Sequence, residues 1–170
     1  MICPVCGDPN LPGEDLCVGC QFDLAAVDRP FSNDTVEGSL ITHMVGVLRP
    51  RPPVTVPADA TLDVAVAAMI AEQVGAVLVV GPGGQLVGIL TERDFLTRVA
   101  GSPGYGALPV SQFMTRDPEA VAPTDPLGFA LAKMDLGGYR HLPVTESGRP
   151  VGVISVRDIL RHVMHLCNDG

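Results

Sequence analysis

The sequence predicts a mixed α+β (α/β) fold in which two copies of one β-α-β-β-α unit follow a small N-terminal metal-binding ribbon. Three observations predict this organisation. Four of the five cysteines lie within the first 20 residues. A stretch of about 64 residues then occurs twice in succession. Hydrophobic residues make up 46% of the 170-residue chain and charged residues 18%, a balance that allows a buried core. The length allows one domain with an appendage.

The four N-terminal cysteines form two C-x2-C pairs, Cys3 with Cys6 and Cys17 with Cys20. Two thiolates at this spacing can turn toward one ion, and two such pairs close a tetrahedral four-sulfur site that suits Zn²⁺. We therefore expect residues 1–27 to form a zinc ribbon, with a structural metal supplying its folding energy. Two disulfides or a redox C-x-x-C pair are the alternatives, and four thiolates also accept iron.

The acidic charge of the chain bears on its partners. The net charge is −8, and the first 30 residues alone carry −4 before any metal is bound. Nucleic acids and anionic membranes need a basic face, so neither is expected as a partner, and contact with a protein is the better prediction for the ribbon. The N-terminus resembles no secretory signal, and a glycine-rich turn breaks the longest uncharged stretch. We expect a cytoplasmic protein without membrane spans.

Residues 28–47 predict a linker followed by one helix around Val36–Leu48, with apolar positions on one face. After this segment the chain repeats. Gly75–Val99 aligns with Tyr139–Val163 at a constant shift of 64, whereas the preceding stretches align at a shift of 65. This predicts that one residue is gained or lost before Gly75. A period this long, present only twice, indicates a duplicated domain.

Each copy shows the same order of predicted elements. A short apolar strand precedes an amphipathic helix, two β-forming runs flank a glycine-containing turn, and a helix closes the copy. Thr61 or Asp59 can cap the first helix of the first copy, and Pro126 suits the first helical position of the second. The predicted elements are Val54–Val56, Thr61–Glu72, Ala76–Val80, Leu86–Leu90 and Glu92–Val99, then Ala120–Ala122, Pro126–Leu136, His141–Val144, Val151–Ile154 and Val156–Leu166.

The repeated motifs carry a family resemblance. GQLVGILTERDFL (84–96) and FMTRDPEAV, GGYRHLPV and GRPVGVISVRDIL (within 113–160) resemble a tandem pair of cystathionine β-synthase (CBS) domains. The resemblance implies a pseudo-two-fold pair, here 48–106 and 107–170, in which strands of both copies pack together. It also implies clefts that bind AMP, ADP, ATP or S-adenosylmethionine, and dimerisation through helices.

Two repeated polar pairs are the candidate ribose contacts: Thr91 with Asp94, and Ser155 with Asp158. Each pair lies between a predicted strand end and a helix start. A carboxylate can accept hydrogen bonds from two vicinal hydroxyls, and the Thr or Ser hydroxyl adds a polar contact. The alternative is a helix cap, because a Thr or Ser with an acid three residues later resembles a capping box. The two interpretations are compatible.

Phosphate contacts are predicted only by the resemblance, which assigns them to Arg140, His141 and Arg157. At the shift of 64 the first-copy residues equivalent to the first two are Ala76 and Val77, so the copies differ here and one cleft is expected to suit phosphates better. The resemblance also places adenine against apolar backbone near Val77. The alternative for Arg157 is an exposed helix residue paired with nearby acids.

His162 and His165 are expected to face solvent or an interface, with a second metal site alongside Cys167 as the alternative. No catalytic set is found, so we expect no enzyme. We expect instead a regulatory module that binds an adenosyl ligand and signals to a partner protein or a homodimer interface. The alternative is a ligand-free scaffold that docks a partner through the zinc ribbon.

Overall fold

The computed structural model describes residues 2–3, 5–11, 14–22, 24, 35–99 and 104–168. Its two compact units are Met1–Leu48 with Thr124–Arg140 and Val156–Gly170, and Arg49–Pro123 with His141–Ser155. The predicted linker over 28–34 lies outside the described residues, as do residues 101–103 between the copies. Because the second copy is divided between the two units, the compact units differ from the sequence repeats.

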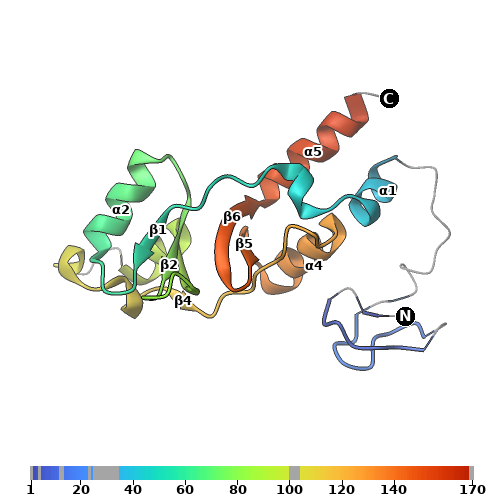
Figure 1. The fold of residues 1–170 in the computed structure, drawn as a ribbon, viewed down its shortest axis with the longest axis horizontal. Coiled ribbons are helices and arrows are strands. Elements are labelled where there is room, and N and C mark those ends of the chain that lie inside the picture. The colour runs from blue at the N-terminus through green and yellow to red at the C-terminus, as the bar shows by residue number, and fades with distance from the viewer. Residues whose placement is uncertain are drawn as a thin grey trace. The chain divides into compact units, whose positions relative to one another are not determined.

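The strands of both copies belong to the second unit (Figure 1). One sheet has the order β1-β2-β3-β4, with β1 parallel to β2 and the other neighbours antiparallel, and β5 and β6 form an antiparallel pair. The strands are β1 (Thr55–Pro57), β2 (Ala76–Val80), β3 (Leu86–Thr91), β4 (Thr115–Arg116), β5 (His141–Glu146) and β6 (Arg149–Ser155). Helices α2 (Leu62–Ala71) and α3 (Glu92–Asp94), continued by a π-helical turn at Phe95–Val99, complete the first copy.

The core of this unit is built from the apolar runs that predicted the strands. Burial removes apolar surface from water, which is the main favourable term in folding. Val153 of β6 packs against a buried cluster of the first copy, so strands of both copies share a core, as predicted. That cluster is Ala76, Leu78 and Ile89, and the larger cluster is Val56, Leu62, Ala65, Met69, Val77, Val79, Leu90, Val99, Val110 and Met114.

Strand register confirms the duplication. Val56 pairs in parallel with Val79, and Val121 pairs in parallel with Val144, so both partners shift by 65. The second copy reduces its first strand to this single bridge, where the sequence predicts a strand over residues 120–122. The β-α-β-β-α order is therefore present twice, with one shortened strand.

The position of the extra residue differs from the prediction. Val79 pairs with Gly88 and Val144 with Gly152, so the copies align at 65 before the hairpin turn and at 64 after it. The extra residue lies in the first-copy turn, and the prediction that it precedes Gly75 is wrong. The apolar strands misled the alignment because their valines and leucines match at either shift.

This correction changes which residues correspond. The Glu92 N–H donates to the Gly75 carbonyl at 3.0 Å, and the Val156 N–H donates to the Arg140 carbonyl at 3.2 Å. Arg140 and His141 therefore correspond to Gly75 and Ala76, not to Ala76 and Val77. The expected difference between the copies remains, because the second copy has two basic residues where the first has two small uncharged ones.

The two copies exchange short segments. β4 lies near the start of the second copy in sequence but pairs with β3 of the first, while Arg51 lies near the start of the first copy but bridges Val153 of the second. A glycine faces each exchanged segment. A Cβ on Gly152 would lie 2.5 Å from the Pro50 Cβ, and a Cβ on Gly88 would overlap the Met114 side chain. At Gly152 the ring of Pro50 leaves no room for a Cβ, whereas at Gly88 the Met114 side chain would have to move and the Thr115 carbonyl would lie 3.2 Å from the Cβ.

The first unit contains α1 (Thr35–Thr42), a 3₁₀ turn at Val45–Leu48, α4 (Leu127–Gly137) and α5 (Val156–Asn168). The predicted single helix over Val36–Leu48 is interrupted. The Val45 N–H donates to the Asp125 carbonyl, and the Leu127 N–H donates to the His43 carbonyl, both at 2.8 Å. A continuous helix would use the Val45 N–H and the His43 carbonyl in its own hydrogen bonds. Here both groups bond to residues at and just before the start of α4, and the helix is interrupted.

Two predicted helix starts also differ in detail. Thr61 occupies the N-cap of α2, but its side chain makes no capping bond. Pro126 is the N-cap of α4 rather than its first helical residue. Among the described residues, no helix combines the length and apolarity needed to cross a membrane.

Candidate ligand and metal sites

Hydrogen bonds between Thr91 and Asp94 join the end of β3 to the start of α3. The Thr91 hydroxyl donates to Asp94 Oδ2 at 2.6 Å, and the Thr91 N–H donates to the same oxygen at 3.0 Å. The Asp94 N–H donates back to the Thr91 hydroxyl at 3.3 Å, which completes a capping box. The capping interpretation is thus confirmed for the first copy, and it holds the carboxylate in one orientation.

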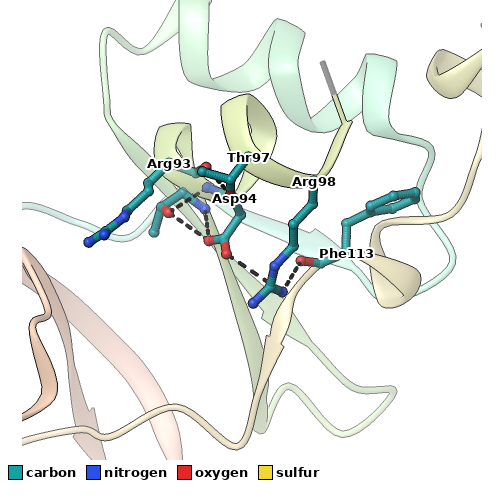
Figure 2. A network of polar contacts seen from close by, with 6 residues as sticks. Arg93, Asp94, Thr97, Arg98 and Phe113 are labelled. Atoms are coloured by element: carbon teal, nitrogen blue, oxygen red, sulfur yellow. Dashed lines mark hydrogen bonds and ion pairs between the residues drawn. The ribbon is translucent and has the colours of Figure 1, made fainter. Parts of the chain in front are cut away.

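The other Asp94 oxygen faces a basic side chain (Figure 2). Arg98 Nη1 lies 3.6 Å from Asp94 Oδ1 and donates to the Phe113 carbonyl at 3.1 Å. The Arg98 side chain is 51% exposed and can move, whereas that of Asp94 is 14% exposed. A carboxylate offers about four lone-pair sites, so the contacts described here leave acceptor capacity on Asp94.

The second copy repeats the residue pattern with different neighbours. Ser155 ends β6 opposite His141 of β5, and Asp158 lies in the first turn of α5. Arg161 Nη1 pairs with Asp158 Oδ1 at 3.2 Å. Each acid thus has an arginine within one helical turn, at i+4 in the first copy and at i+3 in the second.

His141 contacts the first copy. A Cβ on Gly75 would lie 3.3 Å from its Cε1 and Nε2 atoms, and 3.4 Å from the Glu92 Cδ. The imidazole therefore lies against the backbone of Gly75, which is linked to Thr91 through Glu92. The structure brings His141 close to the chain that carries the first polar pair.

The remaining predicted ligand residues are placed as follows. Arg140 and Arg157 are exposed, whereas the Val77 side chain is fully buried in the core. The prediction that adenine lies near Val77 can therefore concern only the Val77 backbone. The copies differ in charge, because Gly75 and Glu92 in the first correspond to Arg140 and Val156 in the second.

The four N-terminal cysteines converge. Their sulfur atoms all lie within 4.8 Å of one another, and the Cys3–Cys20 and Cys6–Cys17 distances are 3.6 and 3.5 Å. All four are free thiols, so the disulfide alternative is not realised. Tetrahedral zinc with bonds of about 2.3 Å places sulfurs about 3.8 Å apart, so the cluster fits such an ion.

Asn10 is a supporting residue that the sequence did not single out. Its side chain is buried and donates to the Asp8 carbonyl at 2.8 Å and to the Cys17 sulfur at 3.5 Å. Its carbonyl oxygen accepts the Val18 N–H at 3.0 Å. Asn10 therefore connects the backbone beyond the first cysteine pair to the second pair.

The thiols differ in acidity. Burial disfavours the Cys17 thiolate, but the Cys20 and Gly19 N–H groups, the Cys6 thiol and the Asn10 amide favour it and lower the pKa of Cys17 to about 6. For Cys6 the Asp8 N–H favours the thiolate, but burial and the neighbouring sulfurs outweigh it and raise the pKa to about 12. The negative charge of one thiolate thus makes it unfavourable to ionise the neighbouring thiols. A bound cation would offset this repulsion.

A second polar cluster joins α1 to α5. The Ser39 hydroxyl lies 2.7 Å from His43 Nδ1, and this nitrogen lies 2.9 Å from His162 Nε2. Sequence reasoning missed the cluster and expected His162 at a solvent-facing or interface position. The spacing of Ser39 and His43 within a helix was visible in the sequence, but their partner 119 residues beyond His43 was not.

Together these features define a duplicated α/β domain pair with a four-cysteine cluster at its N-terminus. The CBS domain model matches residues 46–101 and 110–165, about two thirds of the chain. The chain belongs to the CBS domain family.

Relatives and solved structures agree with this assignment. CBS domain-containing protein CBSCBSPB1 of Arabidopsis thaliana is 36% identical over 114 residues, which cover 66% of this chain and 21% of the relative. The CBS domain of a membrane protein from Sphaerobacter thermophilus is similar at a TM-score of 0.62 and 30% identity, covering 75% of this chain and 91% of that one. A CBS domain protein from Pyrobaculum aerophilum, solved in complex with AMP, has a TM-score of 0.64 and 29% identity, covering 72% and 98%. The chain spans about a fifth of the length of the Arabidopsis relatives it matches first.

Proposed function

We propose that this chain is a non-catalytic regulatory module that binds an adenine nucleotide or S-adenosylmethionine. The observation that carries the proposal is the fixed hydroxyl–carboxylate pair of Thr91 and Asp94 at the end of β3, which recurs in sequence as Ser155 and Asp158. The similar Pyrobaculum aerophilum protein was solved with AMP, which supports the choice of ligand class.

In this proposal each carboxylate accepts the two vicinal hydroxyls of a ribose. The capping bonds hold Asp94 before the ligand arrives, which reduces the entropy lost on binding. The adenine rests on strand backbone near Val77, and Arg140, His141 and Arg157 supply phosphate contacts. Because the second copy carries Arg140 where the first has Gly75, we expect its site to bind phosphorylated ligands more tightly.

The cysteine cluster takes a structural zinc ion in this proposal, held by Cys3, Cys6, Cys17 and Cys20. Bound zinc stabilises a segment too short to fold on its own core. The ribbon then offers a surface to a partner protein. A ligand can bias that partner, or a homodimer interface, only by binding one arrangement better than another. We place this module in the cytoplasm.

Titration calorimetry of the full chain with AMP, ADP, ATP and S-adenosylmethionine tests the ligand class. Saturable heat with at least one of the four is expected, and Asp94→Ala and Asp158→Ala identify which copy binds. No heat with any of them would contradict the proposal.

A ligand-free scaffold is the second candidate. One observation favours it for the first copy: Thr91 and Arg98 already contact both Asp94 oxygens. It predicts no thermal shift with nucleotides, together with loss of partner capture in Cys6→Ser.

A further inference from the structure

Arg98, which is not among the ligand residues above, is held beside Asp94 by the main chain (Figure 2). Its Nη1 donates to the Phe113 carbonyl at 3.1 Å and lies 3.6 Å from Asp94 Oδ1. The other carboxylate oxygen, Asp94 Oδ2, accepts the hydroxyl and the N–H of Thr91. Each member of the Arg98–Asp94 pair is therefore positioned by the protein. At 3.6 Å, Nη1 and Oδ1 are too far apart for a hydrogen bond with each other.

The equivalent pair of the second copy is arranged differently. Arg161 Nη1 donates directly to Asp158 Oδ1 at 3.2 Å, from the next turn of the regular helix α5. Arg98 instead lies in the π-helical turn after α3 and takes a backbone carbonyl as its acceptor. The first copy thus holds a donor and an acceptor side by side without joining them.

Such a pair suits a hydroxyl group. A carboxylate only accepts hydrogen bonds and a guanidinium only donates them, whereas a hydroxyl does both at once. Hydrogen bonds to a hydroxyl oxygen are about 2.8 Å long. One hydroxyl can therefore reach both Arg98 Nη1 and Asp94 Oδ1 across their 3.6 Å separation.

We propose that Arg98 is a further ligand-binding residue of the first copy, which donates to a ribose hydroxyl oxygen while Asp94 Oδ1 accepts from the same hydroxyl. This inference rests on the proposed function, because it concerns the same ribose. The Phe113 carbonyl holds Arg98 before the ligand arrives, which reduces the entropy lost on binding. The arginine also offsets the charge of the carboxylate, which would otherwise repel the phosphate of a nucleotide.

Calorimetry of the full chain with adenosine tests the proposal. Adenosine carries no phosphate, so its affinity does not report the general attraction of an anion to a cation. An Asp158→Ala background disables the second-copy pair. In this background Arg98→Met, which keeps most of the stem and removes the donors, is expected to weaken adenosine binding about three- to tenfold, the contribution of a typical hydrogen bond. Arg93→Met is the matched control and should bind as before, because Arg93 is exposed and its guanidinium points away from the Asp94 carboxylate (Figure 2).

Deoxynucleosides separate a hydroxyl contact from a structural role of Arg98. The same titrations use 2′-deoxyadenosine and 3′-deoxyadenosine. With Arg98 present, at least one of them should bind more weakly than adenosine. That loss of affinity should shrink about three- to tenfold in Arg98→Met, since the hydroxyl and its donor then no longer act together. A merely structural role would weaken all three nucleosides by the same factor.

Unchanged or tighter adenosine binding by Arg98→Met would overturn this assignment, and tighter binding would show that Arg98 competes with the ribose for Asp94. A loss with both deoxynucleosides that does not shrink in Arg98→Met would equally overturn it. So would binding to the wild type that disappears in Asp158→Ala, because the first copy would then bind no ribose. Absence of binding by adenosine, the three adenine nucleotides and S-adenosylmethionine to the wild type would overturn the proposed function as well.

Discussion

The imidazole of His141 lies against the backbone of Gly75, where a Cβ would approach its Cε1 and Nε2 atoms to 3.3 Å. This contact joins the first strand of the second hairpin to the chain that carries Thr91 and Asp94. Gly75 itself corresponds to Arg140, so one copy has an open backbone where the other has a cationic side chain.

Gly75→Ala should therefore displace His141 and weaken nucleotide binding. We expect AMP affinity to fall about fivefold, equivalent to one hydrogen bond of about 1 kcal/mol. Calorimetry checks this, with Gly75→Ala repeated in a His141→Ala background as control. If Gly75→Ala weakens binding equally in both backgrounds, the effect does not pass through His141.

Gly152→Ala should destabilise the fold, because its Cβ would meet the Cβ of Pro50 at 2.5 Å and the Arg51 carbonyl at 3.4 Å. The expected loss in the free energy of unfolding is about 1–3 kcal/mol, the usual range for overpacking. Urea unfolding measures it. Gly38→Ala in α1 is the control, because a Cβ there meets nothing within 4 Å, and it should gain up to about 1 kcal/mol. Equal urea unfolding midpoints for Gly152→Ala and the wild type would contradict the close approach of the Pro50–Arg51 segment to Gly152.

Thr91→Ala should remove the capping box at α3. We expect a loss of about 1 kcal/mol in the free energy of unfolding, since an orphan helix donor loses its partner. Thermal or urea unfolding detects this change. Thr97→Ala, which removes an exposed hydroxyl bonded to the Arg93 carbonyl at 2.7 Å, should stay within about 0.5 kcal/mol. A larger effect at Thr97 than at Thr91 would contradict the assignment of the cap.

Asn10→Ala should weaken metal binding at the cysteine cluster without removing a ligand. The Cys17 sulfur loses a hydrogen bond and the Val18 N–H loses its acceptor. Affinity is expected to fall by about 10- to 100-fold, as for other supporting residues around metals. Competition with a chromophoric chelator measures it, and exposed Val18→Ala should match the wild type. Unchanged affinity in Asn10→Ala would show that the cysteines hold the ion unaided.

Local features could be predicted from the sequence more accurately than the pairing of strands. The C-x2-C spacing predicted the convergence of Cys3, Cys6, Cys17 and Cys20, because each pair is a local turn and the second pair follows closely. The strand and helix order also followed from period and turn residues. The exchange of Arg51 and β4 between copies did not, because strand partners are long-range and both alternatives bury similar apolar residues.

The position of the extra residue in the first copy was predicted wrongly for a related reason. Alternating valines and leucines align at either shift, and the strand registers of Val79 with Gly88 and of Val144 with Gly152 decide between them. Asn10 and the contact of His43 with His162 were missed because single polar residues carry no periodic signal.

In the proposed function, Asp94 and Asp158 bind the hydroxyls of an adenosyl ribose. The most direct measurement compares AMP with 2′-deoxy-AMP by calorimetry on the wild type, Asp94→Asn and Asp158→Asn. Loss of the 2′-hydroxyl is expected to weaken wild-type binding by at least about tenfold, as for a hydrogen bond to a charged group. This loss of affinity should be smaller in the variant whose carboxylate made the bond. Equal affinity of the wild type for the two nucleotides, or an undiminished loss in both variants, would contradict this role of the two carboxylates.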